Sequence, residues 1–189
     1  SYIFTSYRPL HEIAPTVFFR SALSGFCEEM YLKPASNADM KIILSSFQER
    51  YSFSLPATTI DIILDLAGGH VQYLHLILNK LKKEKMDPKI LSDSHAMLKL
   101  FSADEEIRFL SEELFSSLFE AEQDILMGKN IELPNSQSQV TGKYIKDTGM
   151  GQEGRTWKFF NPLFTSYIHD LRKHTRSHSS DFLFILARE

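Results

Sequence analysis

The chain has 189 residues, of which 43% are hydrophobic and 24% charged, and its net charge is −3. This composition is that of an ordinary globular protein, and the small negative charge gives no general support for nucleic-acid binding. A single cysteine, Cys27, excludes an internal disulfide framework and any cysteine-based zinc site. No apolar run approaches the ~20 residues that cross a bilayer, and no signal-peptide pattern opens the chain, so we expect a cytoplasmic protein without a membrane partner.

The N-terminal segment predicts a piece of a larger domain. Residues 2–5 are rich in strand-forming types and are closed by Pro9. Residues 18–30 favour one or two short helices, followed by a brief extended piece. Because the chain opens directly on a strand, we expect residues 1–35 to be the remnant of a core whose other strands are supplied elsewhere.

Residues 36–101 predict a small all-helical domain. Ser36, with an acidic residue three positions later, is an N-cap signal for a helix that runs to about residue 51. A second helix begins near Pro56 and stops at Gly68-Gly69, a pair that tolerates positive φ. A third runs from His70 to about residue 85, and residues 89–101 predict a fourth. Apolar side chains at helical spacing mark the inward faces of the first three: Met40, Ile43, Leu44 and Phe47; Ile60, Ile63, Leu64 and Ala67; Val71, Leu74, Ile77, Leu78 and Leu81.

Residues 102–172 predict a winged-helix domain. A long amphipathic helix over 103–119 is followed by a shorter one over 120–127 and a third over 140–148, which Gly149 ends. A turn then leads into a strand over 155–160, and Asn161-Pro162 begins the last helix. Helices, hairpin and final helix follow the winged-helix order, so the fold class is mainly α with one small β-hairpin.

The last segment, residues 173–189, predicts a tail. It is polar up to residue 181, and the apolar run 182–187 is interpreted as a short strand. Since an uncovered apolar strand is prone to pair with other chains, we expect a partner surface for it.

The sequence lacks the parts that hold a nucleotide in P-loop proteins. Thr141-Gly142-Lys143 contains the Gly-Lys pair but not the upstream glycine or the hydroxyl residue that should follow. We therefore expect no enzymatic activity and no cofactor for this chain alone. The histidines and carboxylates show no spacing typical of a metal site.

The Gly68-Gly69-His70 corner is the most specific motif. A glycine pair lets two helices meet sharply and leaves the first amides of the next helix at its positive end, where they can face an anion. A plain helix end followed by a helix start explains the same residues. However, residues 66–74, Leu-Ala-Gly-Gly-His and the apolar helix after it, resemble the lid motif of STAND and archaeal-type ATPases of the AAA-related P-loop class.

Other segments carry the same resemblance. Residues 4–10 resemble the sensor 1 strand and its polar tip, 21–26 and 31–36 the connection into the lid, and 157–164 the wing and final helix of the appended winged helix. The resemblance implies a P-loop core that binds ATP and Mg²⁺, with Gly68, Gly69 and His70 facing the nucleotide and Arg8 or Ser6 at the sensor position. The chain departs from the family pattern at Val71, where proline is frequent, and in lacking the Walker A and Walker B segments.

Three functions remain open from the sequence. The first is a non-catalytic lid and winged-helix module of a signal-transduction ATPase, which responds to nucleotide and binds a protein partner or itself. The second is a winged-helix regulator that binds nucleic acid through Lys143, Lys146, Arg155 and Lys158. Residues 102–170 hold six Lys and Arg against twelve Asp and Glu, which disfavours phosphate binding. The third is an interaction scaffold without any nucleotide.

Overall fold

The computed structural model describes residues 8, 9, 12, 14, 30–84, 86–128, 142–152 and 157–186, with only the backbone course for 176–186. The chain divides into two compact units, residues 1–32 and 33–189. In the first unit, the Arg8 guanidinium pairs with the Glu12 carboxylate at 3.3 Å. The expected strand at 2–5, Ser6, and the expected helices up to residue 29 lie outside the described residues.

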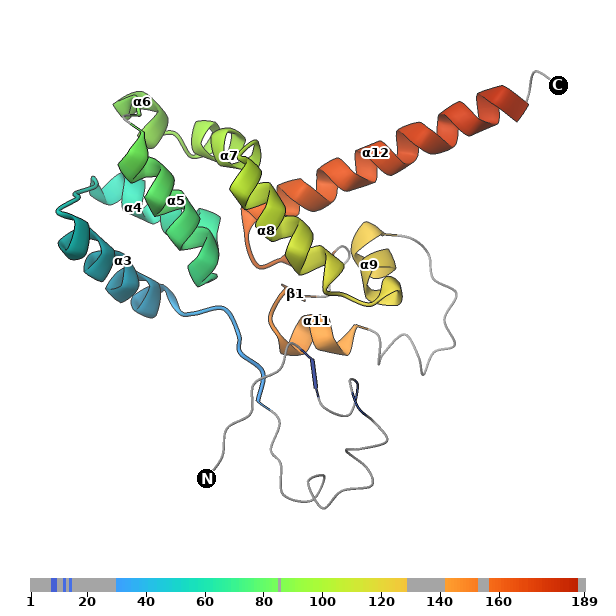
Figure 1. The fold of residues 1–189 in the computed structure, drawn as a ribbon, viewed down its shortest axis with the longest axis horizontal. Coiled ribbons are helices and arrows are strands. Elements are labelled where there is room, and N and C mark those ends of the chain that lie inside the picture. Colours follow the sequence, from blue (N-terminus) through green and yellow to red (C-terminus); the bar gives the residue numbers. More distant parts are fainter. Residues whose placement is uncertain are drawn as a thin grey trace, which may run out of the picture. The chain divides into compact units, whose positions relative to one another are not determined.

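In the residues described, the second unit is mainly helical, as predicted, with one small antiparallel sheet (Figure 1). In the hairpin, Gly151 pairs with Phe159 and Gln152 with Lys158. The elements in chain order are α3 (Asn37–Tyr51), α4 (Ala57–Ala67), α5 (Val71–Lys83), α6 (Pro88–Leu91), α7 (Ser94–Ser102), α8 (Glu105–Ser116), α9 (Glu120–Met127), α11 (Lys143–Asp147), β1 (Gly151–Gln152), β2 (Lys158–Phe159) and α12 (Pro162–Leu186).

Local sequence signals place several helix ends as expected. The Ser36 hydroxyl accepts a hydrogen bond from the Asp39 amide at 3.2 Å, which satisfies one of the free donors at the start of α3. Gly68 ends α4 in the left-handed region, with φ of 55°. Asn161 and Pro162 begin α12, with the asparagine outside the helix and the proline at its first position.

Two of the predicted elements are wrong. Residues 89–101 form α6 and α7 instead of one helix, because Asp93 caps a new helix by accepting from the His95 and Ala96 amides. The apolar run 182–187 is not a strand: α12 continues through the predicted tail as far as Leu186. Arg172, Lys173 and Arg176 are good helix formers, and no proline or glycine stands in residues 172–181 to end the helix.

Two hydrophobic clusters form the interior of the second unit. The larger lies among α3, α4, α5, α7 and the first turns of α8, and the smaller lies among α9, α11, β2 and α12. Of the predicted inward side chains, Ile43 and Ile60 are half-buried and Val71 is 38% exposed, whereas the others are buried. Phe160 and Leu114 pack against both clusters, so the end of the hairpin and helix α8 join the two cores.

Candidate functional site at the Gly68-Gly69 corner

The corner between α4 and α5 is packed against two distant stretches of backbone. Gly68 and Gly69 have φ values of 55° and 83°, which side chains rarely adopt. A Cβ atom on Gly68 would overlap the Phe160 carbonyl oxygen and lie 2.5 Å from Asn161 Cβ. A Cβ on Gly69 would lie 2.5 Å from the Ala35 carbonyl oxygen. Glycine is therefore required at both positions, because neighbouring backbone leaves no room for a Cβ atom and because φ is positive.

Hydrogen bonds fix the corner on both sides. The Ala35 amide donates to the Gly69 carbonyl at 2.8 Å. On the other side, the buried Asn161 donates from Nδ2 to the Ala67 carbonyl at 3.3 Å and accepts at Oδ1 from the Phe164 amide at 2.7 Å. Asn161 thus caps α12 and holds the end of α4 with the same side chain.

His70 lies between two aromatic rings. Its ring centroid is 5.2 Å from that of Tyr73 and 5.6 Å from that of Phe160. The buried Nδ1 has no hydrogen-bond partner in the part of the chain that the structure describes. Burial lowers the pKa of the imidazole, because the charged form loses hydration in this apolar surrounding. His70 is therefore held neutral in the fold.

The lowered pKa of His70 makes stability depend on pH. The unfolded chain binds the His70 proton more tightly than the folded chain does. The stability contributed by neutral His70 is therefore fully present above the pKa of the unfolded chain. It is lost as the pH falls below that pKa toward the lower pKa of the folded chain. As pH falls below about 6.5, the ordinary histidine pKa, we expect the free energy of unfolding to fall more steeply in the wild type than in His70→Phe. Urea unfolding at several pH values measures both slopes, and equal slopes would contradict the assignment.

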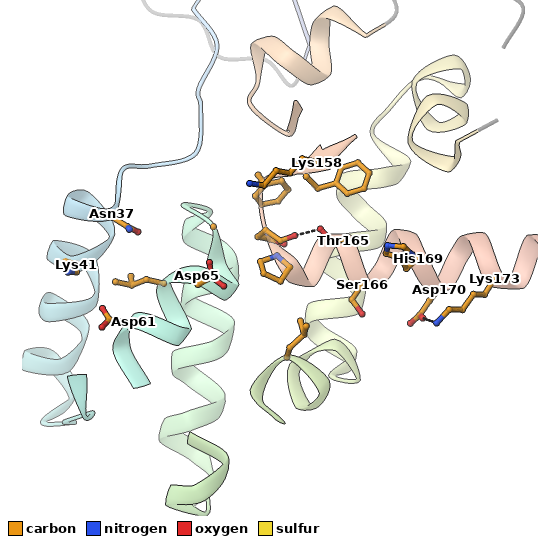
Figure 2. Close-up of a pocket in the computed structure, with 17 residues that line it drawn as sticks. Asn37, Lys41, Asp61, Asp65, Lys158, Thr165, Ser166, His169, Asp170 and Lys173 are labelled. Atoms are coloured by element: carbon orange, nitrogen blue, oxygen red, sulfur yellow. Dashed lines mark hydrogen bonds and ion pairs between the residues drawn. The ribbon is translucent and has the colours of Figure 1, made fainter. Parts of the chain in front are cut away.

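A cleft of about 810 Å³ lies beside the corner, between helices α3 and α4 on one side and β2 and α12 on the other (Figure 2). Gly68 belongs to its lining, whereas Gly69 and His70 do not. Its remaining lining residues are Asn37, Lys41, Asp61, Leu64, Asp65, Leu98, Lys158, Phe159, Phe160, Asn161, Pro162, Thr165, Ser166, His169, Asp170 and Lys173.

The charges of this cleft are mixed. Asp61 and Asp65 line the α4 side, while Lys41 and Lys158 line other parts of it (Figure 2). Asp170 lies 3.7 Å from Arg108 and 3.9 Å from the Lys173 amine. Such a balance selects neither an anion nor a cation. Among the residues described, no group of three or more His, Cys, Asp or Glu side chains is arranged to hold a metal.

The cleft also lacks an activated nucleophile in the part described. The Thr165 hydroxyl donates to the Asn161 carbonyl at 2.7 Å, which is a helix-end contact and not an interaction with a general base. The contacts described at the corner connect α4 and α5 to the segment before α3 and to the start of α12.

The basic residues of the nucleic-acid hypothesis lie on different elements. Lys143 and Lys146 are exposed on α11, which has only five residues. The Lys146 amine is 6.0 Å from the Trp157 ring centroid. Lys158, which follows Trp157 in the chain, instead lines the cleft beside the corner. Arg155 lies outside the described residues.

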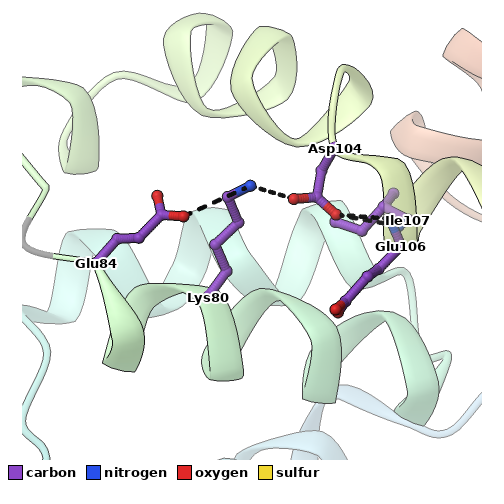
Figure 3. Close-up of polar contacts among 5 residues, drawn as sticks. All are labelled: Lys80, Glu84, Asp104, Glu106 and Ile107. Carbon is purple, nitrogen blue, oxygen red and sulfur yellow. Dashed lines mark hydrogen bonds and ion pairs between the residues drawn. The ribbon is translucent and has the colours of Figure 1, made fainter.

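Two polar contacts attach α8 to α5. The Tyr73 hydroxyl is 2.7 Å from the Ser111 hydroxyl, and Ser111 donates to the Ile107 carbonyl at 2.9 Å. Nearer the end of α5, Lys80 pairs with Asp104, which also caps α8 by accepting from the Glu106 and Ile107 amides (Figure 3). The hydrogen bond that Lys80 donates to the Asp104 carboxylate is the main cause of the raised Lys80 pKa.

Asp104 should contribute more stability than an ordinary cap. Asp104→Ala is expected to lower the free energy of unfolding by about 2 kcal/mol, about half from the lost cap and the rest from the Lys80 pair. Asp93→Ala removes a cap of the same type on α7, without an ion pair to a neighbouring helix among the contacts described, and is expected to cost about 1 kcal/mol. Chemical denaturation of both variants measures the difference, and equal losses would show that the Lys80 pair contributes nothing.

Sequence reasoning found the corner but missed what it touches. Asn161 was interpreted only as part of a helix start, although its bond to the Ala67 carbonyl spans 94 positions. No local pattern reports such a contact. Phe160 likewise gave no signal beyond an apolar strand residue.

Comparison with protein families, curated proteins and solved structures gave no match. No helix within the described ranges is both long and apolar enough to span a membrane.

Proposed function

We propose that this chain is the lid and winged-helix part of a signal-transduction P-loop ATPase, and that it passes the nucleotide state of the core to a protein-binding surface. In this proposal ATP and Mg²⁺ are held by a P-loop core that this chain does not contain. Arg8 stands at the sensor position, and Gly68, Gly69 and His70 form the lid corner. The chain itself performs no hydrolysis.

One observation carries the proposal: the corner is joined to the start of α12 and to the segment before α3 at the same point. Gly68 packs on the Phe160 carbonyl and the Asn161 Cβ, and the Gly69 carbonyl accepts from the Ala35 amide. A displacement of the corner must therefore move both neighbours, since close-packed groups cannot deform independently. This is the property that a lid needs if it is to transmit a change at a phosphate to a distant helix.

The buried His70 Nδ1, which has no hydrogen-bond partner among the described residues, also supports a functional corner. A buried polar atom without a hydrogen bond costs about 1–3 kcal/mol. Local rules of folding tend to be broken at functional sites, where another requirement outweighs stability. An apolar aromatic residue at position 70 would satisfy the packing against Tyr73 and Phe160 without this cost.

The first test concerns the gene. The reading frame that precedes the codon for Ser1 is expected to encode a glycine-rich loop with Gly-Lys-Ser/Thr, followed by a strand that ends in acidic residues. A frame without such a loop would contradict the proposal that the core belongs to the same polypeptide.

The second test is hydrogen exchange on the polypeptide that contains that core. Exchange of ADP for ATP is expected to change amide protection in residues 66–74 and 157–164 together, because the corner joins them. The α6 helix, Pro88–Leu91, serves as the internal control and should not respond. The proposal fails if nucleotide exchange leaves both segments unchanged or alters one of them alone.

A further inference from the structure

A second groove lies on a different face of the helical bundle, between α5 and α8. It has a volume of about 590 Å³. We call it the α5–α8 groove, and its lining is Gln72, His75, Leu76, Glu105, Glu106, Phe109, Leu110 and Glu113. Phe109 is 67% exposed, although Leu110 beside it is buried. A large exposed ring next to a hollow is typical of a surface that receives another apolar side chain.

The rim of the α5–α8 groove is acidic. Glu105, Glu106 and Glu113 contribute carboxylates, and Glu112 on the same helix is exposed. The nearby cation Lys80 is already paired with Asp104 and Glu84 (Figure 3). Charge complementarity therefore requires an occupant that combines a basic flank with large apolar residues.

The distal end of α12 has this composition. The helix has 25 residues and spans about 37 Å. Beyond Leu171 it carries Lys173, whose amine lies 3.9 Å from the Asp170 carboxylate but whose side chain is 77% exposed, and Arg176, and then five consecutive apolar residues at 182–186. A helix that is apolar on all sides is normally covered by other protein. The same long helix is seen in Figure 1 as the red element.

This end cannot reach the groove of its own chain. Helix α12 is continuous, so residue 184 lies about 18 Å along the axis beyond residue 172. The described contacts of α12 with α4, α7, α8, α9 and β2 fix its course relative to the bundle. A return to the α5–α8 groove would need a break in the helix, and no proline stands in residues 163–189.

We propose that residues 173–186 of one copy dock in the α5–α8 groove of a second copy, and that the exchange is reciprocal. Two equivalent contacts related by a two-fold axis close the assembly as a dimer. The apolar run at 182–186 covers Phe109 and Leu76, while Lys173 and Arg176 lie along the glutamate rim. This inference goes beyond the proposed nucleotide response and uses no nucleotide.

The first experiment measures mass in solution. Light scattering on the eluted chain, without nucleotide, is expected to show a dimer that dissociates on dilution. Phe109→Ser should weaken dimerisation about tenfold or more, as for a central aromatic contact. Ile42→Ser on α3 is the matched control, because Ile42 is 66% exposed outside the groove, and its dimerisation should equal that of the wild type. A monomeric wild type, or equal effects of both variants, would overturn the proposal.

The second experiment identifies the contact. Glu113→Lys and Arg176→Glu should each weaken the dimer, and the double variant should recover most of the loss, because the reversed charges again attract. A labelled synthetic peptide of residues 171–186 should bind the wild-type chain and lose about tenfold affinity for the Phe109→Ser variant. Additive losses in the double variant, or a peptide that binds both chains equally, would show that another surface makes the dimer. Because none of these assays contains ATP, their results test the dimer contact alone and neither support nor contradict the lid proposal.

Discussion

Gly68→Ala is expected to be among the most damaging single substitutions in this chain, lowering the free energy of unfolding by about 2–5 kcal/mol. Of this, about 1–2 kcal/mol comes from placing a Cβ atom in the left-handed region, where φ is 55°. The rest comes from forcing that atom into the Phe160 carbonyl and Asn161 Cβ. Both obstacles are at or next to backbone, so neither can rotate away.

Gly128→Ala is the control for the Gly68 substitution. Gly128 has φ of 70°, but among the described residues a Cβ atom there would meet only the end of the Arg172 side chain at 3.7 Å. Its replacement should therefore cost only the conformational term, about 1–2 kcal/mol. Urea unfolding of the two variants gives the difference directly. Losses of equal size would mean that the corner is not closely packed on the end of the hairpin.

Asn161→Ala is expected to lower the free energy of unfolding by about 2–3 kcal/mol, because one side chain makes two separate contacts. Loss of the hydrogen bond that the Phe164 amide donates to Oδ1 removes the cap of α12, which costs about 1 kcal/mol. Loss of the bond from Nδ2 to the Ala67 carbonyl adds about 1 kcal/mol. The Ala67 carbonyl still accepts from the His70 amide, which limits the second term.

Asn161→Ser separates the two contributions. Serine is a good cap but is too short to reach the Ala67 carbonyl, so the variant should recover about 1 kcal/mol relative to alanine. In hydrogen exchange, Asn161→Ser should loosen residues 66–70 while leaving the first turn of α12 protected. If serine and alanine are equally destabilising, the cap contributes nothing and the α4 contact accounts for the whole effect.

These substitutions also bear on the proposed lid. If the corner transmits a displacement, a variant that keeps the fold but weakens the contact to α12 should uncouple the two segments. Asn161→Ser is suited to this test because its expected loss is small. In the polypeptide with the P-loop core, residues 66–74 should still respond to nucleotide, and residues 157–164 should respond less.

The sequence by itself determined the helical elements and many of their ends. Ser36 and Gly68 act through the adjacent backbone, so local chemistry is sufficient to place them. Apolar spacing identified the buried faces, since a helix repeats its faces at a fixed interval. Two helix ends were predicted wrongly. Asp93 caps a new helix within the single helix predicted over 89–101. The polar stretch before residue 182 continues α12 instead of ending it.

Only the tertiary structure decided what the corner touches and which surfaces remain open. The Asn161 bond to Ala67 and the approach of Phe160 to Gly68 join segments more than ninety positions apart. Likewise, the α5–α8 groove exists because two helices leave Phe109 uncovered between them. Periodicity reports which side of a helix faces inward, but the partner across that side depends on how all the helices pack together, and this information is not contained in any local stretch of sequence.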